Sequence, residues 1–344
     1  MLQREKRSRN PGMLITLGLS LSAVFAWHTP LSAEPCTTVP ACISQLQFGE
    51  SRSSREHAAA ILGERGSPAA IPHLAKALQT DQGEFVRANA AEALGRIGGQ
   101  STLEPLKNVL ANEKRPHVRR KAALALGQTK LAEAEALLGQ ILSSDNEWQV
   151  RKAAAAALGV LGKKGGASYL AKALTGDGRS EVRQTSADSL AVLAGDGETE
   201  LVQALTKDPD YRVRVAAARA LASVTGESSV TALLGVLTKD KRPEVRRQAV
   251  TAFGSRRETR AVEAMILVLQ YDVDLVVRLQ AARELARIGG DRAREALIYY
   301  KSHGELREIR RAAVDALEDF ATDAPPQPEL PKPEGDGAQD GEGQ

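Results

Sequence analysis

The stretch Phe85-Val86-Arg87-Ala88-Asn89-Ala90-Ala91-Glu92-Ala93-Leu94-Gly95-Arg96-Ile97-Gly98 recurs, with variation, along most of this 344-residue chain. Its valine, the alanine four residues later and the leucine eight residues later fall on one face of an α-helix. An arginine marks each copy, and seven of the nine arginines directly follow a valine. Seven of the eight gaps between successive arginines are 32 residues and one is 31. The marker arginines are Arg55, Arg87, Arg119, Arg151, Arg183, Arg214, Arg246, Arg278 and Arg310. A fixed period in this range predicts a stacked-repeat protein.

A second apolar helix precedes each marker arginine. Leucines recur nine and thirteen residues before it, as Leu78 and Leu74 do before Arg87, and a spacing of four places both on one helical face. Each unit is therefore predicted to be a helical hairpin that buries its apolar faces only by stacking on its neighbours. We predict an all-α fold, an α-solenoid of about nine stacked helical hairpins over residues 34–322.

A row of acidic residues keeps the same period, six residues before the arginine. Its members are Asp81, Glu113, Asp145, Asp177, Asp208, Asp240 and Asp272. A regular row of carboxylates could bind metal or carry catalysis, but strict periodicity favours a structural role. We expect each carboxylate to cap the second helix and to pair with an arginine of its own unit or of the next. The arginines and acids are interpreted together as one structural ladder.

Residues 1–33 do not belong to the repeat. A basic start, Arg4 to Arg9, is followed by an apolar run over residues 13–27 and by small residues up to Ala33. This order predicts a secretory signal peptide that is cleaved near Glu34. An uncleaved anchor in contact with the membrane is the alternative, although about 15 apolar residues are fewer than the roughly 20 needed to span a bilayer. We expect an exported protein, located in the periplasm or cell envelope or secreted.

Cys36 and Cys42 are the only cysteines of the chain. They lie just after the expected cleavage site, and in an oxidising compartment a short-range disulfide between them is favoured. The alternative is two free thiols, with Cys42 filling a core position. No second pair of Cys or His residues follows to complete a tetrahedral metal site.

The last segment, residues 323–344, contains prolines, glycines, six acidic residues and one lysine. It has too little apolar surface to offset its ordering entropy, so we expect a disordered tail that acts as a spacer or, alternatively, docks. Residues 1–33 contribute a charge of +3 and the tail −5, which leaves +5 for the repeats. That mild charge, with 3% aromatic residues, argues against a nucleic-acid partner.

Residues 85–98 resemble the second helix of a HEAT repeat, and the resemblance extends over residues 37–321. They are most similar to the short bacterial type that also occurs in phycobilin lyase subunits. The resemblance implies a curved solenoid whose second helices line the concave face. The terminal units depart from the pattern with polar residues, as expected of caps that lack one neighbour. These departures are Cys42, Ser54, Lys301, Gly304 and Glu318.

Enzymes with this scaffold form the alternative class of function. Deoxyhypusine hydroxylases have a similar repeat, but in several of their units His-Glu directly follows the arginine and supplies iron ligands. In this chain the two residues after each marker arginine are pairs such as Arg120-Lys121, and none is His-Glu. A phycobilin-lyase-like enzyme subunit remains an alternative, which the export signal and the tail disfavour. We expect no catalytic residues, no metal and no cofactor.

Recognition of a protein partner by a monomeric scaffold is the remaining hypothesis. Side chains that vary beside the repeating arginine, on the exposed side of the second helix, are the candidates for partner binding. They are Arg120, Lys121, Leu124, Lys152, Gln184, Asp188, Arg219, Arg247 and Thr251.

Overall fold

The computed structural model describes residues 36–193 and 197–322. These residues form eighteen α-helices and three short 3-10 helices, η1(Pro68–Ala70), η2(Gln100–Thr102) and η3(Thr259–Ala261), without a β-strand. The all-α solenoid predicted from the repeat is confirmed. The predictions of a signal peptide in residues 1–33 and of a disordered tail in residues 323–344 lie outside the described residues.

The odd-numbered α-helices are the first helices of the hairpins, and the even-numbered ones are the second helices. The first helices are α1(Val39–Phe48), α3(Ile71–Thr80), α5(Leu103–Asn112), α7(Ala134–Ser144), α9(Gly166–Gly176), α11(Glu198–Lys207), α13(Glu227–Lys239), α15(Val262–Tyr271) and α17(Asp291–His303). The second helices are α2(Arg52–Arg65), α4(Glu84–Ile97), α6(Pro116–Gln128), α8(Trp148–Leu161), α10(Ser180–Leu193), α12(Tyr211–Leu221), α14(Pro243–Arg256), α16(Leu275–Ile288) and α18(Arg307–Thr322).

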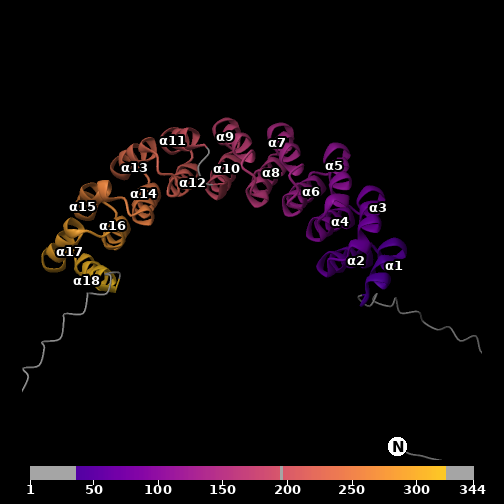
Figure 1. Ribbon diagram of the computed structural model, residues 1–344, viewed down its shortest axis with the longest axis horizontal. Coiled ribbons are helices and arrows are strands. Elements are labelled where there is room, and N and C mark those ends of the chain that lie inside the picture. The colour runs from indigo at the N-terminus through magenta and orange to yellow at the C-terminus, as the bar shows by residue number, and fades with distance from the viewer. Residues whose placement is uncertain (1–35, 194–196, 323–344) are drawn as a thin grey trace, which may run out of the picture. The chain divides into compact units, whose positions relative to one another are not determined.

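The nine hairpins stack along a curved path, with the second helices on its inner side and the first helices on its outer side (Figure 1). Each first helix packs on the second helix of its own hairpin, and each second helix packs on the second helix of the next hairpin. Successive first helices contact one another far less. Unequal contact on the two sides of a stack bends it toward the closely packed side, which accounts for the curvature.

Small residues allow the second helices to approach closely. In four units the residue eight positions after the marker arginine is a glycine that packs on a small residue of the next second helix: Gly63 on Ala93, Gly95 on Ala125, Gly127 on Ala157 and Gly159 on Ser189. A Cβ at Gly95 would lie 2.6 Å from the Cα of Ala125, and one at Gly127 would lie 2.8 Å from the Cα of Ala157. No side chain fits at such distances, so the close contact depends on glycine.

The core runs without a break through the stack. The repeated valine, alanine and leucine positions are buried, as Val86, Ala90 and Leu94 illustrate with no exposed surface. The leucine pairs of the first helices are buried as well, including Leu74 and Leu78. The residues that the repeat pattern assigns to the interior therefore lie there, except that Leu317 in the last unit is only half-buried.

The first hairpin carries the only disulfide among the described residues, which joins Cys36 to Cys42. Cys42 is also fully buried in the first turns of α1, so it fills the core position that leucine takes in later units. Within residues 36–193 and 197–322, no helix has the length and apolar character required to cross a bilayer.

Candidate functional site

The repeated arginines and acids form a ladder along the edge where first helices turn into second helices. In a typical rung, Arg119 donates from Nε to Oδ2 of Asp145 over 2.8 Å and from Nη2 to Oδ1 over 3.0 Å. Nη1 of Arg119 donates to the backbone carbonyl of Glu113, at 3.0 Å. Paired two-bond rungs join Arg55–Asp81, Arg87–Glu113, Arg119–Asp145, Arg151–Asp177, Arg183–Asp208, Arg214–Asp240 and Arg246–Asp272.

The direction of this pairing corrects the sequence expectation. Each acid pairs with the arginine of the preceding unit, as Asp145 does with Arg119, and not with that of its own or the next unit. The arginine of its own unit, Arg151, instead donates to the backbone carbonyl of Asp145, at 2.9 Å. Stacking places the preceding arginine beside the carboxylate, whereas the turn between the helices brings the unit's own arginine beneath the carbonyl. Every rung therefore ties two units together.

The carboxylates also fix the turn at the start of the second helix. Oδ1 of Asp145 accepts from the amide of Glu147, at 2.9 Å, and Oδ1 of Asp81 accepts from the amide of Gly83, at 2.8 Å. Glu147 and Gly83 are themselves the residues that precede α8 and α4. We had expected the carboxylate to cap amides inside the second helix. It instead accepts from the amide of the N-cap residue and so holds the turn before the helix.

The rungs lower the pKa of several carboxyls. Burial would raise the pKa of Asp81, but the hydrogen bonds from Arg55 and from the Gly83 amide outweigh it, and the pKa lies below its ordinary value. Burial is likewise outweighed at Asp177 by the bonds from Arg151 and the Arg179 amide, which lower its pKa. These groups are held as anions, which favours their structural role in the ladder.

The ladder weakens at its last step. Gly304 stands where an acid is expected, and Nη2 of Arg278 lies 3.9 Å from Glu305, a largely exposed side chain. Nε of Arg278 donates instead to the carbonyl of Leu269, at 2.8 Å. The final hairpin is therefore joined to the stack without a two-bond rung, in keeping with its polar departures from the repeat.

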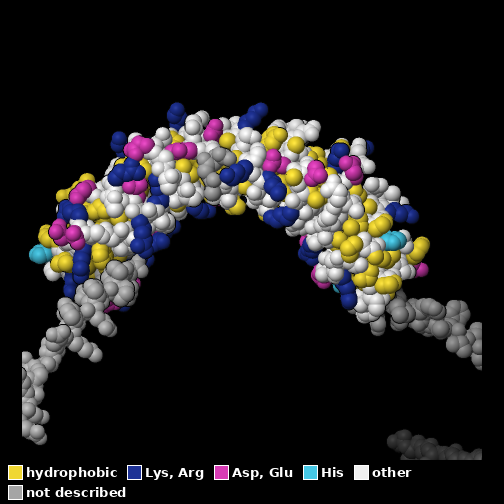
Figure 2. All heavy atoms as spheres, viewed as in Figure 1, with side chains coloured by type: hydrophobic (Ala, Val, Ile, Leu, Met, Phe, Trp, Pro, Cys, Tyr) yellow, Lys and Arg dark blue, Asp and Glu magenta, His cyan; other side chains and the backbone are white. Residues whose placement is uncertain are grey.

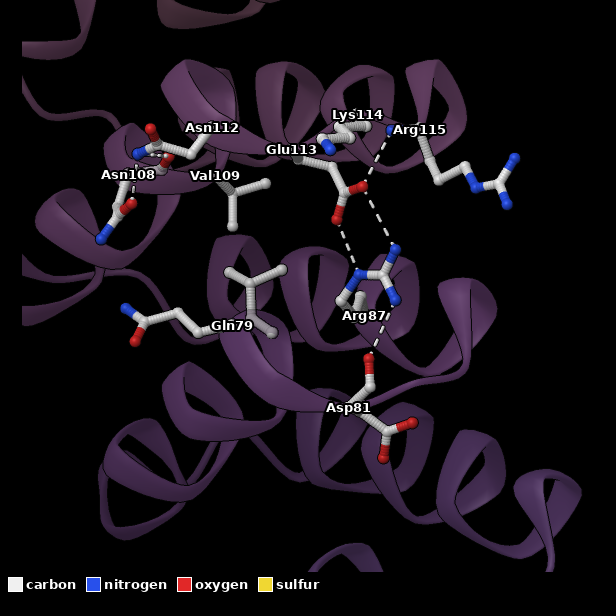
Figure 3. A pocket seen from close by; sticks show the side chains of 10 residues that line it. Gln79, Asp81, Arg87, Asn108, Val109, Asn112, Glu113, Lys114 and Arg115 are labelled. Carbon is white, nitrogen blue, oxygen red and sulfur yellow. Dashed lines mark hydrogen bonds and ion pairs between the residues drawn. The ribbon is translucent and has the colours of Figure 1, made fainter.

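A groove lies between the ends of α3 and α5, beside one rung of the ladder (Figure 3). Its volume is about 470 Å³, and the Arg87–Glu113 pair forms one wall of it. The amide side chains of Gln79 and Asn112 lie on the other side. Arg87 and Glu113 are bonded to each other and to the turn, so they are engaged in holding the stack.

Similar grooves recur at other steps of the stack. They lie between α1 and α3, between α7 and α9, between α9 and α11, and between α11 and α13, where the volume reaches about 700 Å³. All of them separate successive first helices. They follow from the splay of the outer helices, so a groove of this kind is a feature of the repeat and does not single out one unit.

The inner face presents the candidate binding residues. Figure 2 shows Lys and Arg side chains gathered along the inner side of the arc. Lys152 on α8 and Arg247 on α14 are exposed, and within the described chain their side chains form neither an ion pair nor a hydrogen bond. Gln184 is half-buried, while Arg120 is half-buried with Nη2 3.2 Å from Nδ1 of His117. Three of the nine predicted residues, Arg120, Lys152 and Arg247, are thus cations without a carboxylate partner in the described chain, and Gln184 adds a neutral amide.

Three of the predicted residues are engaged with the neighbouring second helix. Lys121 pairs with Glu92 at 2.5 Å, and Arg219 pairs with Asp188 at 3.0 Å. Both pairs bridge adjacent second helices, and the Lys121 ammonium lowers the pKa of Glu92. At Asp188, burial raises the carboxyl pKa although Arg219 opposes this. These residues reduce the free charge of the inner face.

The remaining two predicted residues are also engaged. Leu124 is half-buried and packs against the core. The hydroxyl of Thr251 donates to the backbone carbonyl of Arg247 within α14, at 3.1 Å. Neither side chain is therefore as available to a partner as the exposed side chains of Lys152 and Arg247.

The sequence reasoning missed two further inner-face arginines. Arg283 on α16 and Arg311 on α18 are exposed, and neither side chain has an ion-pair or hydrogen-bond partner in the part of the chain described. They stand five and one residues after their marker arginines, at the positions already used for the middle units. Extending that rule to the last units would have found them. We call Lys152, Arg247, Arg283 and Arg311 the unpaired inner-face cations.

A second feature escaped sequence analysis because it depends on neighbouring turns. Guanidinium groups lie over aromatic rings where second helices begin: Arg52 over Phe85 at 4.7 Å, and Arg242 over Tyr211 at 4.2 Å. Arg179 lies 4.9 Å from the ring of Trp148 in the same way. Such contacts stabilise the turn edge. Across residues 36–193 and 197–322, no three His, Cys, Asp or Glu side chains are grouped to hold a metal ion.

Comparison with known proteins identifies the repeat. No curated protein matches the chain. Among solved structures it is similar to the karyopherin Kap121p bound to the extreme C-terminus of the protein phosphatase Cdc14p, with 16% identity and a TM-score of 0.54 over 82% of this chain and 38% of that one. It is also similar to the CpcE–CpcF complex of phycocyanin lyase from Nostoc, with 23% identity and a TM-score of 0.35 over 86% of this chain and 98% of that one.

A third similar structure is human deoxyhypusine hydroxylase in complex with glycerol, with 21% identity and a TM-score of 0.35 over 76% of this chain and 99% of that one. At these identities, the similarity concerns the fold. The family model of HEAT repeats matches residues 39–126, 103–191 and 198–282, well over half of the chain. The chain therefore belongs to the HEAT-repeat family.

Proposed function

We propose that this protein is an exported, noncatalytic solenoid that binds an acidic protein partner on its inner face. The observation that carries the proposal is the set of unpaired inner-face cations. Most other arginines near the second helices are used within the ladder or against neighbouring acids, whereas Lys152 and Arg247 are exposed without such partners in the described chain. Charged groups left without a partner on a concave surface favour complementary charge on a bound molecule.

The scaffold supports this proposal. Kap121p, similar to this chain in fold, is seen in complex with a protein segment. Stacked second helices supply a long surface whose backbone is held by seven two-bond rungs, so the varying side chains are presented without large rearrangement. Binding to a preorganised surface loses less conformational entropy than binding to a mobile one.

Charge reversal on the inner face tests the partner surface. The full chain with Arg120→Glu, Lys152→Glu and Arg247→Glu should lose capture of its partner from a cell-envelope extract. The matched control reverses three exposed lysines of the outer helices, Lys172, Lys207 and Lys239, and should capture the partner as the natural chain does. Unchanged capture by the inner-face variant, with circular dichroism showing both variants folded, would refute this surface.

Export is tested separately. The proposal rests on the signal-like order of residues 1–33, so the full chain should reach the periplasm or envelope and lose its first residues. Mass spectrometry of the mature protein should place its N-terminus near Glu34. A protein that keeps its initiator methionine and stays with the cytoplasmic fraction would contradict the proposed location.

A further inference from the structure

The end of the solenoid and the segment that follows it carry opposite charges. Arg247 on α14 and Arg283 on α16 belong to the unpaired inner-face cations. Residues 323–344, directly after α18, carry six acids against one lysine. We propose that this acidic C-terminal segment docks in cis on the inner face of α14 and α16.

Nearby acids leave these two arginines available. Glu284 on α16 is buried and accepts hydrogen bonds from Gln280 at 2.8 Å and Arg287 at 3.0 Å. Glu244, at the start of α14, lies 3.4 Å from Arg242. The acids closest along these helices therefore have other partners, while Arg247 and Arg283 face solvent.

The helix from which the segment leaves is a poorer site. Besides Arg311, α18 carries the exposed acids Asp315 and Glu318. These carboxylates repel an acidic chain, so they direct it away from α18 toward the two preceding second helices. Charge repulsion therefore favours docking of the segment on α16 and α14 over docking on α18.

The length of the segment fits this path. Its 22 residues reach at most about 70 Å when extended. Adjacent helices pack at about 10 Å, so α14 lies roughly 20 Å from α18 along the stack. The acids from Glu329 to Glu342 span enough chain to lie against both arginines. Tethering supplies an effective concentration of about millimolar, which allows weak charge pairs to hold the segment.

This docking would make the segment a built-in competitor for the acidic partner. In that respect the inference rests on the proposed function, since both use the inner face. The docking itself requires no partner, so it can be tested alone. Energy transfer that shows docking, together with capture that is unchanged in the charge-reversed variant, would refute the proposed function alone. Capture that is lost in that variant, together with energy transfer that shows no docking, would refute the docking alone.

Energy transfer in the full chain tests the docking. One dye is placed on Gln344→Cys and the other on Ser255→Cys, an exposed residue of α14, with the native disulfide kept oxidised. The matched control carries the second dye on Thr231→Cys, an exposed residue of the outer helix α13 in the same hairpin. At low salt, transfer to position 255 should exceed transfer to position 231.

Two changes should abolish that difference. Raising the salt from about 0.01 M to about 1 M shortens the Debye length from about 30 Å to about 3 Å and should release the segment. Replacing Arg247→Gln and Arg283→Gln should have the same effect at low salt. The proposal is overturned if transfer to position 255 does not respond to salt or to these substitutions, or if position 231 receives the greater transfer.

Discussion

The marker arginine is a joint between repeats, and its chemistry explains why it recurs. Guanidinium presents several donors in a fixed fork, which allows Arg119 to bind the Asp145 carboxylate with two bonds and the Glu113 carbonyl with a third. The period predicted that these residues belong to one ladder. The expected direction, with each acid paired to the arginine of its own unit or of the next, was wrong, because the distance in space across a stacking interface cannot be read from spacing in the chain.

Breaking one rung should weaken the whole stack. In Asp145→Asn, Arg119 loses its charge partner while the guanidinium remains only 14% exposed. We expect a loss of about 3 kcal/mol in the free energy of unfolding, because a largely buried charge is left uncompensated. Chemical denaturation of the two proteins measures this loss.

The surface pair of Glu104 and Lys107 provides the control for this rung. Its side chains are 75% and 55% exposed, so Glu104→Gln should cost less than about 1 kcal/mol. Equal losses in the two variants would mean that the ladder contributes no more than an ordinary surface ion pair.

The lowered carboxyl pKa values predict loss of stability in acid. The pKa values of Asp81, Glu113 and Asp177 are lower in the folded protein than their ordinary values of about 4, so the unfolded chain binds more protons. Their contribution is complete above pH about 5 and is lost as the pH falls through the folded pKa values. Denaturation midpoints from pH 7 to pH 3 should fall, and should fall less steeply in Asp81→Asn with Asp177→Asn. An equal decline in that variant would contradict the assignment.

At the scale of elements, the separation of the second helices depends on glycine. Leucine and alanine spacing predicted the buried faces correctly, with Leu94 and Ala90 fully buried. The same spacing did not reveal that Gly95 contacts Ala125 of the next unit. The reason is physical: hydrophobic periodicity reports which face is buried, whereas the closeness of two buried faces depends on the volumes of residues that meet across the interface.

Filling this contact should force neighbouring helices apart. In Gly95→Ala the new Cβ would lie 2.6 Å from the Cα of Ala125, so backbone must shift, at a cost of about 1–3 kcal/mol. Gly235 is the matched control, since it lies within α13 and a Cβ there meets nothing within 4 Å. Gly235→Ala should stabilise the protein by up to about 1 kcal/mol through helix propensity. Thermal unfolding of both variants checks the opposite signs.

At the scale of the whole molecule, sequence predicts the scaffold better than the binding surface. Nine copies of one pattern reinforce each other, so the hairpins and their core could be assigned from the chain alone. The surface depends on pairings between units, such as Lys121 with Glu92, which remove candidates that look free in the sequence. Arg283 shows the converse, because a cation on a late unit stays unpaired where neighbouring acids are engaged elsewhere.

Because each hairpin packs only on its neighbours, the same Leu→Ala substitution should have different effects in a middle unit and in the first unit. Leu158 and Leu62 occupy the same position of the repeat and are both buried. Leu158→Ala in the fourth unit should lower the free energy of global unfolding by about 2–5 kcal/mol, because hairpins on both sides depend on it. Leu62→Ala should lower it much less, since the first hairpin can open while the others stay stacked. Hydrogen exchange should then show lost protection confined to α1 and α2 for Leu62→Ala and extended over several units for Leu158→Ala. Identical exchange patterns would mean that the solenoid unfolds as one cooperative unit.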